Sequence, residues 1–201
     1  MKNLFFILLL AAGVMTAQAH NGHGDEHKTH TIDNSNSTVT WLGKKVTGKH
    51  TGQIDIKKGM VTFHGDKLVE ATMIMDMTSI TCTDIEDEGT NAKLIGHLKS
   101  DDFFGVETHP EASFSATGFE MSDEGSYNVT GNLTIKGTSH EISFPIEVQQ
   151  GATGNIEISG TMTFDRTKYN VKYGSGKFFD SLGDKMINDD VSLTFNLATN
   201  S

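Results

Sequence analysis

The chain has 201 residues, of which 36% are hydrophobic, and its 26 acidic and 16 basic side chains give a formal net charge of −10 at pH 7. So acidic a surface repels phosphate backbones and anionic membranes, and a nucleic-acid partner is not expected. The length and the hydrophobic content fit one packed domain, or at most two small ones.

Residues 1–19 have the pattern of a secretory signal peptide. Lys2 is followed by the apolar run LFFILLLAAGVM and then by the small residues Ala17 and Ala19. The run is shorter than the about 20 residues that span a bilayer comfortably, and no second run of that length follows. The sequence therefore predicts a cleaved signal peptide, a mature chain that starts near His20, and an exported protein that does not span a membrane.

Residues 20–30 read HNGHGDEHKTH and predict a flexible polar tail, because nothing apolar recurs in them. Its four imidazoles are three or four residues apart, so they could chelate zinc, copper or nickel. A flexible segment loses conformational entropy on binding, so modest affinity is expected. The alternative function is therefore metal binding through His20, His23, His27 and His30.

From about residue 31, hydrophobic and polar residues alternate with a period of two, which is typical of strands with one buried and one solvated face. Such strands belong to antiparallel sheets. The alternation is cleanest in the C-terminal half, and a bend is expected near Gly59 in the second strand. The eight predicted strands cover about 37–46, 52–63, 68–77, 111–121, 127–136, 141–149, 156–165 and 191–197.

Two long connections interrupt the strands. The first, about 79–109, contains a predicted short helix at 90–99 with an apolar stripe that includes Leu94 and Leu98. The second, about 167–189, precedes the last strand and is rich in aromatic and aliphatic residues. A segment with so much apolar surface is expected to pack on the domain rather than to be disordered.

Eight antiparallel strands that each have one apolar face can form a sandwich or a closed barrel, and closure removes exposed sheet edges. A barrel of eight strands is either filled by side chains or holds one small ligand. Small inward residues and adaptable methionines favour a cavity, although a core of interdigitated small and large residues explains them about as well. The small inward residues are Ala71, Ala116, Gly131 and Gly160.

Three motifs resemble the YceI-like family in order and spacing: GHLKSDDFF at 96–104, HPEASFSAT at 109–117 and GNLTIKG at 131–137. The resemblance covers roughly 30–199, and the barrel domain is expected over 31–199. It implies an all-β, eight-stranded, antiparallel, lipocalin-like barrel in the bacterial periplasm. It also implies a long-chain amphiphile in the interior, a polyisoprenoid or a fatty acid-like lipid. No cofactor is expected. A homodimer is possible on this resemblance, because family members are often dimeric.

The chain departs from the family pattern beside two of the motifs, and its segment 168–184, with YGSGKFF at 173–179, resembles a variant of the family. Lys93-Leu94-Ile95 stand before the first motif in place of the usual Arg-Asp pair, and the turn after 131–137 ends in His140-Glu141 instead of a basic residue and proline. These departures concern the identity of the ligand and above all its head group.

Burial of methylenes, at about 0.8 kcal/mol each, is the interaction that would hold a lipid. Inward residues of the strands are candidates for the cavity wall, and polar residues of the second connection are candidates for the head-group site. Arg166 and Lys177 could pair with an anionic head, and an ordinary ion pair with a nearby acid explains them equally well. The candidate ligand-binding residues are Trp41, Met73, Met75, Met77, Phe114, Val129, Leu133, Ile142, Phe144, Ile158, Met162, Arg166, Tyr169, Tyr173 and Lys177.

The sequence favours a binding protein over an enzyme. It lacks the nucleophile elbow G-x-S-x-G, and GSGK at 174–177 fails the phosphate-loop pattern because Phe178 follows it instead of Ser or Thr. Cys82 is the only cysteine, so it forms no internal disulfide. It could pair between chains, but a small buried side chain with a free thiol is the favoured interpretation. Nothing in the sequence places it beside His97.

Overall fold

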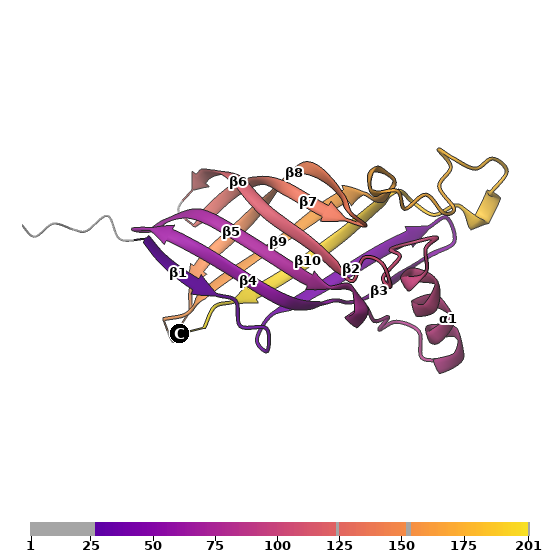
Figure 1. Ribbon diagram of the computed structural model, residues 1–201, viewed down its shortest axis with the longest axis horizontal. Coiled ribbons are helices and arrows are strands. Elements are labelled where there is room, and N and C mark those ends of the chain that lie inside the picture. The colour runs from indigo at the N-terminus through magenta and orange to yellow at the C-terminus, as the bar shows by residue number, and fades with distance from the viewer. Residues whose placement is uncertain (1–26, 124, 152–153, 201) are drawn as a thin grey trace, which may run out of the picture.

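A computed structural model describes residues 27–123, 125–151 and 154–200 of the protein. The predicted signal peptide, together with His20 and His23, lies outside these residues. The described chain is a β-barrel with one α-helix, α1 (Glu88–Lys99), and three short 3-10 helices, η1 (Met77–Ser79), η2 (Arg166–Tyr169) and η3 (Gly183–Lys185) (Figure 1). Within these ranges, no helix has the length and apolar content needed to cross a membrane.

All strand pairs of the barrel are antiparallel, and the order in the sheet is β1-β4-β5-β6-β7-β8-β9-β10-β2-β3. The predicted antiparallel all-β class is confirmed. The strands are β1 (His27–Thr31), β2 (Thr38–Lys45), β3 (Gly48–Gln53), β4 (Asp55–His64), β5 (Lys67–Asp76), β6 (Glu111–Asp123), β7 (Ser126–Ile135), β8 (Thr138–Gln150), β9 (Ile156–Asp165) and β10 (Asp190–Ala198).

The eight predicted strands correspond to β2 and to β4 through β10, and β1 and β3 are additional. Only Ile54 separates β3 from β4, and its N–H donates to the Val39 carbonyl at 3.1 Å. β3 thus continues directly into β4, which stands next to the other end of the strand order, so the chain itself links the two edges of the curled sheet. Ile32 forms a bridge with Thr199, which joins the segment after β1 to the chain after β10.

The irregularity of the second predicted strand is displaced from the expected bend at Gly59. The strand is divided at Ile54, and its register with β5 shifts between Ile56 and Lys58. Gly59 lies within β4, where a Cβ would come within 2.7 Å of the side chains of Ile32 and Met73. The glycine is therefore needed for close packing and does not mark the bend.

The histidine-rich segment is a strand in its last part. β1 pairs with β4 from His27 opposite His64 to Thr31 opposite Met60. The imidazole rings of His27 and His64 stack with their centroids 4.8 Å apart. The flexible tail predicted over 20–30 is thus wrong for residues 27–30, because ladder hydrogen bonds form a strand without an apolar face.

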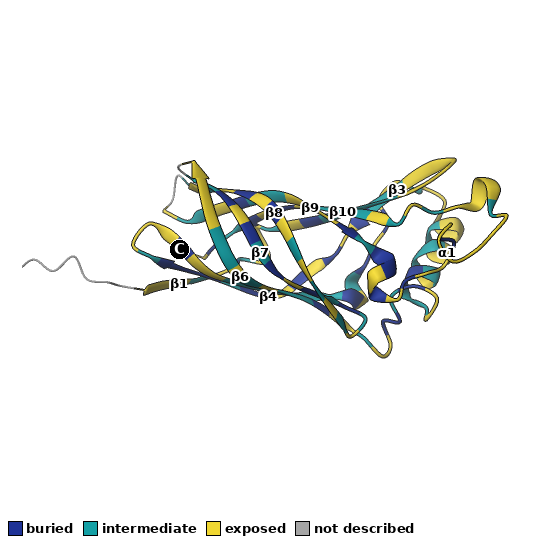
Figure 2. Ribbon diagram, turned by 90° about the horizontal axis from the view of Figure 1, so that it is seen from above, coloured by how far each residue is buried: buried dark blue, intermediate teal, exposed yellow. Residues whose placement is uncertain are grey.

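The core lies inside the barrel (Figure 2). Along β7, Tyr127, Val129 and Leu133 are buried, whereas Asn128 and Asn132 between them are exposed. The same alternation recurs in the other strands of the C-terminal half, as the period of two predicts. The barrel wall therefore has an apolar inner face and a polar outer face.

One end of the barrel carries the longer connections. Figures 1 and 2 show the β2–β3 turn, α1 and the connection between η2 and β10 at this end. Helix α1 begins two residues before the predicted 90–99, because the Asp87 carboxylate caps it by accepting the Thr90 N–H at 2.8 Å. The helix contributes Leu94 and Leu98 to the barrel interior.

Candidate functional site

The barrel encloses a cavity of about 370 Å³. This volume lies within the roughly 300–1,000 Å³ of small-molecule binding sites. Aliphatic, aromatic and methionine side chains form most of the wall. The polar residues that line it, apart from Thr72 and Ser113, come from the β2–β3 hairpin, η2 and the approach to β10: Lys44, Lys45, Lys49, His50, Arg166 and Asn188.

Small residues contribute less to this cavity than expected. Ala71 lines it, but Ala116 does not. A Cβ at Gly131 would come within 2.4 Å of the Phe114 ring, and one at Gly160 within 2.7 Å of the Phe195 ring. These two glycines therefore make room for aromatic rings and leave no free volume of their own.

Most of the predicted ligand-binding residues surround the cavity. Ile142, Tyr169, Tyr173 and Lys177 are not part of its wall. Tyr169 is buried against Phe164 and His140 instead. The lining residues among the candidates are Trp41, Met73, Met75, Met77, Phe114, Val129, Leu133, Phe144, Ile158, Met162 and Arg166.

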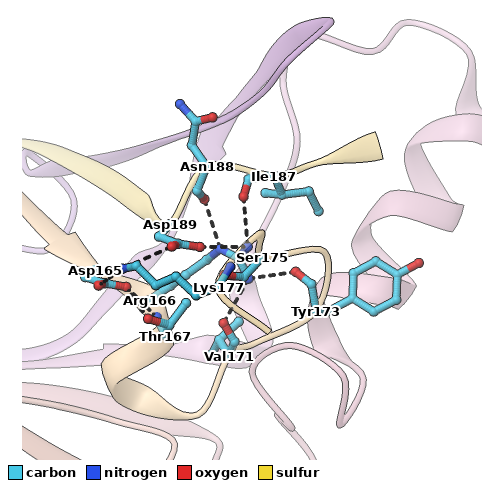
Figure 3. Close-up of polar contacts among 10 residues, drawn as sticks. All are labelled: Asp165, Arg166, Thr167, Val171, Tyr173, Ser175, Lys177, Ile187, Asn188 and Asp189. Atoms are coloured by element: carbon cyan, nitrogen blue, oxygen red, sulfur yellow. Dashed lines mark hydrogen bonds and ion pairs between the residues drawn. The ribbon is translucent and has the colours of Figure 1, made fainter. Parts of the chain in front are cut away.

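Arg166 anchors the long connection rather than presenting its guanidinium to a head group (Figure 3). Its side chain is 2% exposed. Nε donates to the Asn188 carbonyl at 3.0 Å, and Nη2 donates to that of Ile187 at 3.2 Å. Nη1 donates to the carbonyls of Val171 and Tyr173, both at 2.8 Å. Backbone carbonyls occupy these donors, and Nη2 also lies 3.6 Å from Asp189 Oδ1, so the ion-pair alternative describes Arg166 and the head-group role does not fit the structure.

Lys177 and Tyr173 also have protein partners. The Lys177 ammonium lies 2.7 Å from Asp165 Oδ2 and 3.1 Å from Asp189 Oδ2, so the ion-pair alternative describes it. The Tyr173 ring packs edge-on against His97, with centroids 4.5 Å apart, on the outside of the cavity. The charged residues expected at the head-group site, Arg166 and Lys177, therefore hold the connection between η2 and β10 to the barrel.

The carboxyl group of Asp165 makes the contact with Lys177 sensitive to acid. Burial raises its pKa, but the hydrogen bonds from Lys177 and Thr167 lower it more, to about 2 from an ordinary value of 3.8. A carboxyl group with a lowered pKa stabilises the fold above pH 4 and loses that contribution as the pH falls toward 2. The contribution is about 1 to 2 kcal/mol after allowance for solvent screening.

Replacing Lys177 with methionine is therefore expected to remove the part of this contribution that Lys177 makes, and so to lower the free energy of unfolding at pH 7. The variant should also lose part of the decline in stability between pH 4 and pH 2. Urea unfolding at several pH values measures both effects. Lys172→Met is the control, because Lys172 lies over the Phe178 ring at 4.9 Å and has no carboxylate partner among the described residues. Equal pH profiles for wild type and Lys177→Met would contradict the assignment.

The sequence reasoning missed the lysines at the cavity mouth, although it considered His50 there. Lys44, Lys45, Lys49 and His50 all lie on the β2–β3 hairpin and line the cavity. Lys44 is directly opposite Lys49 in the ladder, and like charges in that position destabilise a hairpin. The available signal was the segment GKKVTGK at 43–49, with three lysines and no acid in a chain of net charge −10.

Cys82 is a buried free thiol, as predicted. Burial and the hydrogen bond to Asp84 raise the pKa of this thiol, whereas a reactive cysteine has a lowered pKa. His97 lies elsewhere, against the Phe103 and Tyr173 rings and 3.7 Å from Asp102. The structure thus does not assemble a Cys82–His97 pair.

The two described histidines of the tail do not converge on one point. His27 and His30 are three residues apart on β1, and residues at that spacing on a strand point to opposite faces. His27 stacks on His64, whereas His30 packs edge-on against Phe63 with ring centroids 6.1 Å apart. A shared metal ion therefore does not fit these two side chains.

Comparison with known proteins agrees with this architecture. The YceI-like domain matches residues 30–199. A UPF0312 protein of Staphylococcus epidermidis is 32% identical over 117 residues, or 50% of this chain and 61% of that protein. A UPF0312 protein of Azotobacter vinelandii is 31% identical over 55 residues, or 27% and 29% of the two chains. The chain thus matches less than two thirds of the length of these relatives.

Solved structures share the fold. BcnA of Burkholderia cenocepacia superposes with a TM-score of 0.68 at 26% identity, over 84% of this chain and 99% of that one. A polyisoprenoid binding domain from Saccharophagus degradans gives 0.63 at 16% identity, over 86% and 98%. With a domain match that spans nearly the whole described chain and a barrel of the same fold, this protein belongs to the YceI-like family.

Proposed function

We propose that the protein binds a long-chain amphiphile and holds the apolar chain inside the barrel. The observation that carries this proposal is an apolar cavity whose charged lining residues gather at one end. Ten buried methylenes would contribute about 8 kcal/mol, which is of the order of the 4–15 kcal/mol that association costs. The structural relative from Saccharophagus degradans, described as a polyisoprenoid binding domain, supports a ligand of this class.

The head group of the amphiphile is anionic in this proposal. Lys44, Lys45 and Lys49 line the mouth, and none of them has an ion-pair partner among the described residues. An anion between Lys44 and Lys49 would relieve the repulsion between these facing side chains. A carboxylate or phosphate head fits this hairpin better than a neutral one.

Export to the periplasm through cleavage of residues 1–19 is part of the same proposal, and it rests on the sequence pattern alone. The intact mass of the protein recovered from its host checks the cleavage, which should leave a chain that starts near His20. A homodimer stays a prediction of the family resemblance.

The head-group assignment predicts a selective loss of affinity when Lys44 and Lys49 are both replaced with alanine. Each exposed charge pair contributes about 0.2 to 1 kcal/mol, so the double variant should bind hexadecanoic acid about two to thirty times more weakly. Binding of hexadecan-1-ol, which has the same chain and no charge, should not change. Titration of both ligands by isothermal calorimetry measures the difference.

The matched control is the double variant Lys58→Ala and Lys67→Ala, which removes two exposed lysines that do not line the cavity. It should bind both ligands as the wild type does. Equal losses for acid and alcohol in the Lys44/Lys49 variant would contradict the head-group assignment. Failure of the wild type to bind either ligand would contradict the proposed function itself.

A further inference from the structure

A second group of side chains lies beside the cavity mouth, and the lipid-binding proposal does not use it. His50 on β3 faces Cys82 and Asp84 of the segment that follows η1. His50 Nδ1 is 3.1 Å from Asp84 Oδ2, and Cys82 Sγ is 3.2 Å from Asp84 Oδ1. One ligand atom from each residue lies within 4.8 Å of the other two. An imidazole, a thiol and a carboxylate therefore converge on one point.

The backbone holds the two contributing segments together. The N–H groups of Thr81 and Thr83 donate to the carbonyls of Gln53 and Thr51, both at 2.9 Å, so the 81–83 segment runs along β3. Gly52 allows this approach, because a Cβ there would come within 1.8 Å of the Thr81 carbonyl oxygen. The positions of the three side chains are thus set by hydrogen-bonded backbone on both sides.

Further contacts fix the orientation of the group. The Thr51 N–H donates to Asp84 Oδ1 at 2.9 Å, which orients the carboxylate. The Asn91 amide on α1 donates to the Cys82 carbonyl at 2.9 Å, and the Trp41 indole donates to the Thr81 carbonyl at 2.9 Å. A site whose ligands are held by a second set of contacts loses little entropy when it binds.

The imidazole, thiol and carboxylate groups together favour one class of metal ion. Thiolate and imidazole prefer zinc and other borderline-soft transition-metal ions, whereas magnesium and calcium take oxygen ligands. Three protein ligands with one open position is an arrangement that zinc adopts in many proteins. The side chains of His50 and Asp84 are 37% and 31% exposed, so an ion can reach them from solvent, whereas Cys82 is buried.

We propose that His50, Cys82 and Asp84 form a binding site for a borderline-soft divalent cation of the zinc type, with a fourth position open to water. On binding, the S–H bond of Cys82 breaks, a metal–sulfur bond forms and the proton leaves to solvent. The ion replaces the contacts that Asp84 makes with Cys82 and His50. It lies beside the cavity mouth, because His50 lines the cavity whereas Cys82 and Asp84 do not.

Cobalt(II) is the probe that tests the site, because a cobalt–thiolate bond has a charge-transfer absorption in the near ultraviolet and binding to histidines alone has none. The mature protein, with Cys82 kept reduced, should show this band with one cobalt ion per chain, and zinc should displace it. Cys82→Ser should abolish the band. His50→Gln and Asp84→Asn should each weaken zinc binding by at least about tenfold, because loss of a hydrogen-bond partner of a metal ligand already costs about that much.

Two controls separate this site from the other histidines. The variant in which His20, His23, His27 and His30 are all replaced with glutamine should keep the band, which excludes the tail as its source. His97→Gln, at the same end of the barrel, should also keep it. Circular dichroism and the urea midpoint establish that each variant is folded. The proposal is overturned if the wild type shows no band, or if folded Cys82→Ser and Asp84→Asn bind zinc as tightly as the wild type.

Discussion

Replacing Arg166 with methionine is expected to lower the free energy of unfolding by about 3 to 5 kcal/mol, the range for breaking a buried charged network from one side. The methionine fills much of the same space but leaves the carbonyls of Val171, Tyr173, Ile187 and Asn188 without their donors. Each buried carbonyl that loses its partner costs about 1 to 3 kcal/mol unless water reaches it.

The loss of stability should be largest in the connection between η2 and β10. Limited proteolysis should cut residues 170–188 faster in the variant, and urea unfolding gives the change in free energy. Lys177→Met is the internal comparison, because Lys177 is more exposed and contacts two carboxylates rather than backbone. A loss below about 1 kcal/mol in Arg166→Met, or one no larger than in Lys177→Met, would contradict the anchoring role.

Filling the cavity is expected to weaken lipid binding by about two orders of magnitude. Ala112 on β6 is buried, lines the cavity and pairs with Met75 across the sheet. A phenylalanine at this position places its ring in the space of the ligand chain. If the ring displaces four methylenes at about 0.8 kcal/mol each, affinity for hexadecanoic acid falls by about two orders of magnitude.

Native mass spectrometry of protein purified gently from its host, together with calorimetric titration, measures this loss. The wild type should carry an added mass that disappears on denaturation, and Ala112→Phe should not. Ser115→Phe adds the same ring to the exposed face of the same strand and should retain the ligand. Retention of ligand by folded Ala112→Phe would show that the ligand lies outside the cavity.

Side-chain periodicity is a local property, and the sequence alone therefore determined which faces of the strands are buried. The alternation around Val129 and Leu133 predicts the orientation that β7 has. The same property identified most of the cavity wall, because inward residues of a barrel surround its interior wherever they lie in the chain. Periodicity did not distinguish small residues that border the cavity from small residues that pack against aromatic rings, as Gly131 and Gly160 do.

β1 was missed for a related reason. Its side chains are mostly exposed, so it has no apolar alternation to detect. Its pairing with β4 depends on backbone hydrogen bonds to residues more than 25 positions away, and the pattern of the sequence carries no trace of these.

Only the tertiary structure decided the roles of the charged residues. Arg166 and Lys177 have the composition of a head-group site, yet their partners are carbonyls and carboxylates of the folded chain, and the mouth is lined by lysines of a hairpin that lies far from them in sequence. A long charged side chain reaches several neighbours, and backbone geometry decides which one it meets. For the same reason, only the fold brings His50 to Cys82 and Asp84, since the pairing of β3 with residues 81–83 sets that distance.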